Sequence, residues 1–139
     1  MELPALSPCD ALVAIMVAVS ASDGVMATPG LVAIERMVNH APVFASYDSD
    51  RIRAVAQTVI TLFEEEDEGL DALFGLVRQA LPARLFETAY ALACDVVAAD
   101  GRVGEVEGAL LEEIRDQFEI SRLHAAAIEL AASVRHRML

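Results

Sequence analysis

The sequence predicts an all-α fold in which about seven helices form one domain over residues 1–139, with two related helix–turn–helix units packed in a bundle-like arrangement. Three observations predict it. The composition is 55% hydrophobic and 5% aromatic with no Trp, and its abundant Ala, Leu and Val favour closely packed helices. Apolar positions recur at three- and four-residue steps. Proline residues and Asp-Gly pairs interrupt this pattern at intervals that match the length of an ordinary helix.

The first predicted helix begins after Ser7, which can serve as its cap, with Pro8 at the first helical position. This helix runs to about Ala21 and has apolar residues around nearly its whole circumference. We therefore expect a central helix that is enclosed by other helices or partly covered by a second copy of the chain. A second helix is expected from about Pro29 to His40, again after a cap-and-proline signal.

The middle of the chain predicts two further helices. Ser46 or Asp48 can cap a third helix that runs to about Phe63. The acidic run 64–68, ended by a glycine, is interpreted as a solvated junction. A fourth helix follows over about 70–81.

Pro82 suits the first turn of a fifth helix that continues to about Ala99, where an Asp-Gly pair follows. A sixth helix is expected over about 105–118. Ser121 can cap a seventh that reaches about His136, where basic residues meet the negative end of the helix dipole.

An internal repeat organises these helices, because residues 20–37 align with residues 97–114 at an offset of 77 positions. In both copies an apolar helix ends at an Asp-Gly turn, at Asp23 and at Asp100, and an amphipathic helix follows. Each aspartate can hydrogen-bond local amides and each glycine can close the preceding helix. This structural role explains both Asp-Gly pairs without any bound ligand.

The second turn also places three carboxylates, Asp100, Glu105 and Glu107, within eight residues, and oxygen ligands of this kind hold hard cations such as Ca²⁺ or Mg²⁺. Glu107 falls among apolar positions of the sixth helix and therefore needs hydrogen bonds or a cation. Two interpretations stay open. Glu107 can close a capping box with Gly104, or it can be a metal ligand with Asp100 and Glu105.

The first unit offers fewer ligands. The equivalents of Glu105 and Glu107 are Thr28 and Gly30, so Asp23 is the metal candidate that remains at the first turn.

The segment 98–103, Ala-Ala-Asp-Gly-Arg-Val, together with Glu107 resembles the signature of the tellurite-resistance TerB-like family, which also occurs attached to DnaJ-type co-chaperones. The first unit keeps Asp23-Gly24 but lacks the glutamate. The resemblance implies an all-helical fold in two related halves, a role in chemical-stress resistance, and divalent-cation binding at Asp100 and Glu107, with Asp23 as a further candidate. It also implies protein partners in complexes near the membrane.

The net charge of the chain and its lack of catalytic motifs disfavour several classes of function. Twenty-two acidic residues against ten basic ones give a net charge of −12, which disfavours nucleic acid and anionic lipid as partners. The three histidines fall at helix ends, and no phosphate loop, HExxH motif or Ser-His-Asp arrangement is present, so we expect no enzyme and no catalytic residue.

The apolar stretch 11–21 is too short to span a membrane and has no preceding Lys or Arg, so we expect neither membrane insertion nor a signal peptide. Cys9 and Cys94 lack metal-finger spacing and are expected as free thiols, which fits the cytoplasm. Two hypotheses follow. The chain is a cation-responsive stress module with a protein partner, or a metal-free scaffold or dimerisation domain.

Overall fold

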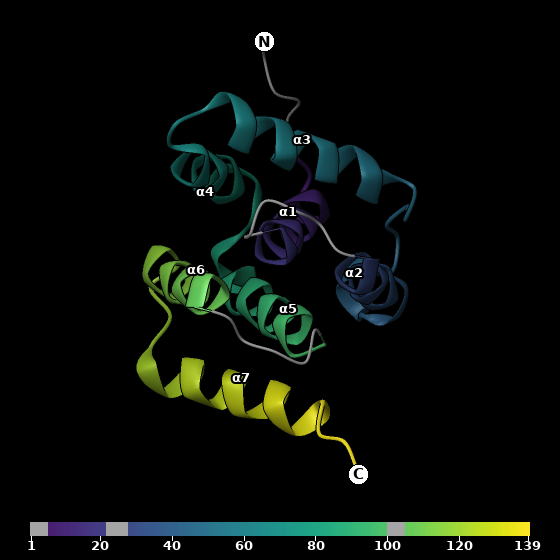
Figure 1. The fold of residues 1–139 in the computed structure, drawn as a ribbon, viewed down its shortest axis with the longest axis vertical. Helices are drawn as coiled ribbons and strands as arrows, with labels where there is room; N and C mark the ends of the chain where they lie inside the picture. Colours follow the sequence, from purple (N-terminus) through teal and green to yellow (C-terminus); the bar gives the residue numbers. More distant parts are fainter. Residues whose placement is uncertain (1–5, 22–27, 100–104) are drawn as a thin grey trace.

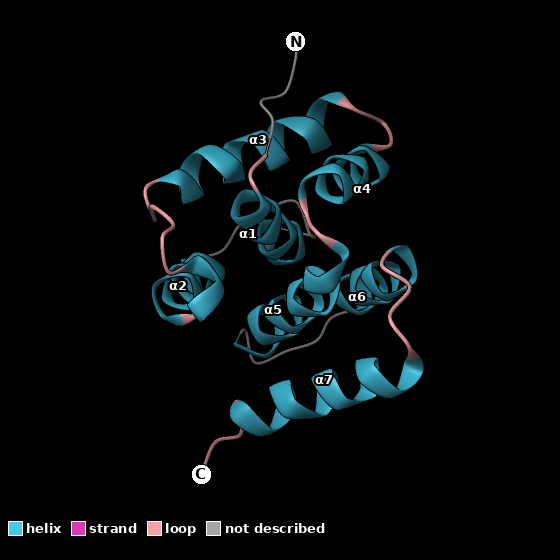
Figure 2. Ribbon diagram, turned by 180° about the vertical axis from the view of Figure 1, so that it is seen from behind, coloured by secondary structure: helices cyan, strands magenta, loops and turns pink. Residues whose placement is uncertain are grey.

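A computed structural model of the chain describes residues 6–21, 28–99 and 105–139, with the backbone alone described at 28–29 and 105–107. The described residues form seven α-helices and two 3₁₀ turns, with no strand among them, which confirms the predicted all-α class (Figure 2). The helices are α1 (Pro8–Ser20), α2 (Thr28–His40), α3 (Arg51–Glu65), α4 (Gly69–Ala80), α5 (Phe86–Ala99), α6 (Glu105–Gln117) and α7 (Arg122–Arg135). The 3₁₀ turns are Pro42–Phe44 and Ala83–Leu85.

The helices surround α1, which lies in the middle of the molecule (Figure 1). α3 and α4 lie on one side of α1, α5 and α6 lie on the other, and α2 lies beside it. α7 packs against α5 and forms the edge of the molecule farthest from α3 (Figures 1 and 2). None of the helices in the described residues combines the length and hydropathy of a membrane-spanning segment.

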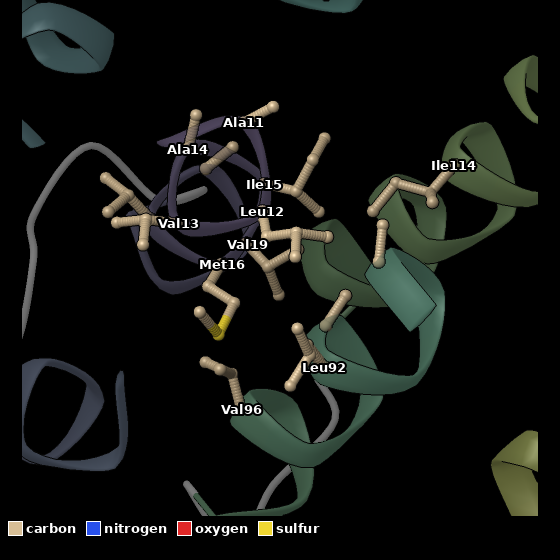
Figure 3. Close-up of a cluster of buried hydrophobic side chains, with 14 of the residues drawn as sticks. Ala11, Leu12, Val13, Ala14, Ile15, Met16, Val19, Leu92, Val96 and Ile114 are labelled. Carbon is tan, nitrogen blue, oxygen red and sulfur yellow. The ribbon is translucent and has the colours of Figure 1, made fainter. Parts of the chain in front are cut away.

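The core is centred on α1, as its apolar circumference predicts. Every residue from Ala11 to Val19 is at most 2% exposed. Figure 3 shows Met16 pointing toward Val96 of α5, and Ile114 of α6 lies on the same side of α1 as Ile15. Burying a side chain of this size stabilises the fold by about 1.5–3 kcal/mol. Because neighbouring helices cover all of this surface, α1 offers no apolar face for a second copy.

The start of α1 confirms the predicted cap. Ser7 is the N-cap, and its hydroxyl accepts a hydrogen bond from the Asp10 N–H at 3.0 Å, while the Asp10 carboxylate accepts one from the Ser7 N–H at 3.1 Å. This is a complete capping box, which satisfies two N–H groups that a helix end leaves without partners. Asp10 is also 1% exposed, so its carboxylate needs further partners inside the fold.

Those partners come from the segment that leads into α3. The Arg51 guanidinium donates to both Asp10 oxygens, at 2.6 and 3.0 Å, and the Tyr47 hydroxyl donates to the same carboxylate at 2.6 Å. Burial by itself raises the pKa of the Asp10 carboxyl, but the bonds from Arg51, Tyr47 and Ser7 outweigh it and lower the pKa to about 2. The ion pair therefore ties the start of α1 to the start of α3.

In the first half, α1 and α2 approach each other closely at Gly30. A Cβ added to Gly30, in the first turn of α2, would overlap the Ser20 hydroxyl oxygen at the end of α1. A side chain at position 30 therefore requires the Ser20 hydroxyl to rotate away.

Two predicted helix starts are wrong. α3 begins at Arg51, after an N-cap, Asp50, that makes no side-chain cap bond. Asp48 instead accepts a hydrogen bond from the Asp50 N–H at 2.9 Å, a local turn that competes with helix formation. Pro82 precedes a 3₁₀ turn, and α5 begins only at Phe86. The ends of α2, α4 and α6 fall within one residue of the predictions.

Candidate functional site

The residues predicted to bind a cation lie outside the part of the chain whose side chains are described. Asp23 and Asp100 fall in the segments 22–27 and 100–104, and Glu105 and Glu107 belong to the backbone-only start of α6. Among the side chains that are described, no three carboxylate, imidazole or thiol groups gather closely enough to hold a metal ion. The capping and metal-ligand interpretations of Glu107 therefore both stay predictions.

A groove with acidic walls lies between the corner of α3 and α4 and the face of α6. We call it the acidic groove; it has a volume of about 400 Å³ and is lined by Ala18, Phe63, Glu66, Asp67, Gly69, Leu70, Ala109, Leu110 and Glu113. Its floor is apolar and its carboxylates come from two sides, the α3–α4 corner and α6. Figures 1 and 2 both show α4 and α6 side by side.

The α3–α4 corner is shaped by one glycine. A Cβ on Gly69 would lie 3.0 Å from the Phe63 Cα and 3.1 Å from the Leu62 carbonyl oxygen, so the chain can reverse this tightly only without a side chain there. The reversal sets Glu66 and Asp67, two of the exposed carboxylates of 64–68, at the groove. The predicted solvated junction is confirmed as exposed, and it also forms one wall of a groove.

Negative charge dominates the groove. Among the described residues that line it, the three ionisable side chains, Glu66, Asp67 and Glu113, are acidic. None of the ion pairs between described residues involves a carboxylate of the run 64–68, and Glu113 accepts only a neutral bond, from Gln117 at 2.9 Å, among the described contacts. An apolar floor beside carboxylates of one sign favours a ligand that combines apolar and cationic groups.

A second cavity, of about 590 Å³, lies between α5, α6 and α7 and contains a partly buried polar cluster. The Tyr90 hydroxyl donates to the Glu129 carboxylate at 2.5 Å, and Arg115 donates to Tyr90 at 3.0 Å and to Glu129 at 2.8 Å. Burial, with the bond to Glu129, raises the pKa of Tyr90. The cluster therefore holds a neutral phenol and a paired carboxylate, and it ties three helices together.

The thiol in this cavity is protonated at neutral pH. Cys94 is 5% exposed, and burial raises its pKa to about 11. The thiolate is the reactive form of cysteine, so Cys94 is a poor nucleophile. Burial also raises the pKa of Cys9, whose thiol lies 3.4 Å from the Val43 carbonyl oxygen. Both cysteines are free thiols, as predicted.

The three histidines lie at separate helix ends. His40 ends α2 and contacts the Arg36 carbonyl oxygen at 2.7 Å. His124 lies in the first turn of α7, with its Nδ1 2.8 Å from a carboxylate oxygen of Glu87. His136 follows α7 and contacts the Ala132 carbonyl oxygen at 2.9 Å. These contacts fit the predicted surface and capping roles.

Sequence reasoning missed the Asp10–Arg51–Tyr47 and Tyr90–Arg115–Glu129 clusters. A serine three positions before Asp10 was a signal for the capping box, but nothing in the sequence indicates its partner 41 residues away. The acidic groove was missed for the same reason, since its walls come from α3, α4 and α6. Only its charge was visible in the sequence, in the acidic run.

Comparison of the chain with protein-family models, curated proteins and solved structures finds no match. The TerB-like resemblance stays an interpretation of the motif around Asp100 and Glu107.

Proposed function

We propose that this chain is a non-catalytic protein-binding module whose acidic groove docks an amphipathic, cationic segment of a partner protein. The observation that carries the proposal is the groove itself, an apolar floor flanked by carboxylates from two directions. Apolar side chains of the partner would cover Phe63, Leu70 and Leu110, and its Lys or Arg side chains would face the rim. An amphipathic helix in a groove is a common mode of peptide recognition.

The acidic character of the chain supports the same partner. With a net charge of −12, the whole surface attracts cationic segments and increases their rate of encounter. The groove would select amphipathic segments over purely cationic ones, because only apolar side chains of the partner can cover its apolar floor. Binding should therefore weaken with added salt, and it should also fail for a cationic peptide that lacks apolar residues.

A designed helical peptide of leucine and lysine, labelled with a fluorophore, tests the proposal by fluorescence anisotropy. The triple variant Glu66→Gln, Asp67→Asn, Glu113→Gln keeps the shape of the rim and removes three charges. At about 0.5 kcal/mol for each exposed ion pair, the dissociation constant should rise about tenfold.

The matched control removes the same number of charges elsewhere, as Glu35→Gln, Asp50→Asn and Asp116→Asn, which are exposed in the structure. This control should bind the peptide nearly as the natural chain does. Equal weakening in both triple variants would show that net charge and not the groove is responsible, and the proposal would fail.

Cation binding is a separate proposal that rests on the motif alone. A divalent ion held by Asp100, Glu105 and Glu107, with Asp23 as a further candidate, would tie the turn between α5 and α6 and so alter one wall of the acidic groove. Calorimetric titration with Ca²⁺ and Mg²⁺ tests it. Heat no greater than that of the Asp100→Ala, Glu107→Gln variant would reject cation binding and leave a metal-free scaffold.

A further inference from the structure

The outermost helix, α7, exposes large apolar side chains. Leu123, Leu130 and Val134 are 76%, 61% and 49% exposed. Together with exposed Ala127 they form what we call the α7 face. An apolar stripe on the outside of an edge helix is typical of a contact with another molecule.

The spacing of the α7 face matches a helix-pairing seam. Its residues follow one another at steps of four, three and four positions, the pattern of alternating a and d positions in a coiled coil. At about 100° of rotation per residue, the face lies directly opposite Ala125 and Ala132, the two buried residues that α7 packs against the core. α7 therefore has two apolar stripes, and only one of them is covered within the described part of the chain.

Small side chains border the α7 face. Ala126 and Ser133, both exposed, lie on one flank, and Ala131 lies on the other. Short flanking residues let a second helix approach closely, and the face itself carries no charged side chain that the approach would have to desolvate.

Charge is distributed unevenly between the two ends of α7. Acidic groups outnumber the one arginine, Arg122, at its start: Glu87 contacts His124 at 2.8 Å, Glu119 lies two residues before the N-cap Ser121, and Asp116 lines a cavity together with Arg122.

The other end of α7 is basic, with Arg135, His136 and Arg137 in succession. One carboxylate, Asp95, lies there and is paired with Arg135 at 2.7 Å. Parallel pairing of two such helices would place like charges together. Antiparallel pairing places the basic end of each helix beside the acidic end of the other, in particular Arg135 beside the Glu87 of the second copy.

We propose that the α7 face binds the α7 face of a second copy, antiparallel and about a two-fold axis, so that Leu123 packs on Val134 and Ala127 on Leu130 of the other chain. The contact is isologous, so it closes as a dimer and leaves no apolar stripe uncovered. It is independent of the acidic groove and would present two grooves on one particle, which strengthens binding to a partner that carries two cationic segments.

Light scattering coupled to size-exclusion chromatography tests the dimer with the full chain over a wide range of protein concentration. We expect a mass that rises from 14.9 kDa toward twice that value. Leu130→Glu, which buries a charge in the seam, should stay monomeric at every concentration. Val32→Glu is the control, because Val32 is a 43% exposed apolar residue on α2 outside the seam. Circular dichroism melting shows that each variant folds.

Disulfide formation between cysteine variants tests whether the two α7 helices pair antiparallel. Ala127→Cys and Leu130→Cys each place one exposed thiol in the seam, and an equimolar mixture is then oxidised. Antiparallel pairing predicts a disulfide mainly between the two different variants, whereas parallel pairing predicts one mainly within each.

Three outcomes would overturn the proposal. The first is a natural chain that stays monomeric at the highest soluble concentration. The second is a dimer that Val32→Glu disrupts as strongly as Leu130→Glu does. The third is a monomer that sediments with phosphatidylserine vesicles unless Leu130 is replaced by Glu, which would assign the α7 face to a membrane surface.

Discussion

Replacing Arg51 with alanine should destabilise the domain, because the Asp10 carboxylate would stay buried after losing its cation. The bonds around Asp10 lower its pKa from 3.8 to about 2. A shift of this size corresponds to about 2 kcal/mol of folding free energy at neutral pH. The Arg51 side chain is 53% exposed, and solvent screens part of its charge, so we expect a loss of about 1–2 kcal/mol and a fall in Tm of about 3–10 °C.

Urea unfolding followed by circular dichroism at neutral pH measures this loss. Arg53→Ala is the matched control, since Arg53 is exposed on the same helix and the structure shows no ion pair between it and another described residue. The control should change the unfolding free energy by less than about 0.5 kcal/mol.

The loss of unfolding free energy in Arg51→Ala should depend on pH in one direction. The folded-state pKa of Asp10 lies below its value of 3.8 in the unfolded chain, so its stabilisation is present above 3.8 and is lost as the pH falls toward about 2. In Arg51→Ala the burial remains without the cation, so the carboxylate no longer contributes. The difference in unfolding free energy between the variant and the natural chain should therefore disappear in acid. A gap that persists once Asp10 is protonated, or an equal loss in Arg53→Ala, would refute the reasoning.

Two further predictions concern packing and thiol chemistry. Gly69→Ala should cost about 1–3 kcal/mol in thermal or urea unfolding, because its Cβ would meet the backbone of Phe63 and Leu62, which cannot simply rotate away; unchanged stability would mean that the α3–α4 corner is looser than the structure shows. Cys94 should react with Ellman's reagent only after unfolding, because it is 5% exposed and burial raises its pKa to about 11, and fast labelling of two thiols in the native chain would contradict the burial of Cys94.

Local signals in the sequence predicted most of the helix boundaries. Ser7 and Ser121 cap α1 and α7 as expected, because a cap depends on a hydroxyl and an amide only three residues apart. The prediction failed where several local options compete. Asp48 makes a turn instead of a cap, and Pro82 starts a 3₁₀ turn, since both residues fit several conformations at similar cost.

The location of α1 was also predicted, because a helix that is apolar on all sides can lie only where other helices cover it. The same argument could not tell enclosure by the chain from cover by a second copy. The structure decides for enclosure, as residues 11–19 are at most 2% exposed. A stripe of large apolar side chains stays exposed on α7 instead, a helix for which the sequence analysis indicated only a cap and a basic end.

The sequence by itself thus determined the class of fold, the central helix and the acidic character of the surface, because these follow from composition and from contacts within a turn or two of helix. Only the tertiary structure decided which carboxylates are buried and paired, which line a groove, and which stripe of α7 faces outward. These properties depend on residues such as Asp10 and Arg51, 41 positions apart, whose meeting is set by the packing of whole helices around α1.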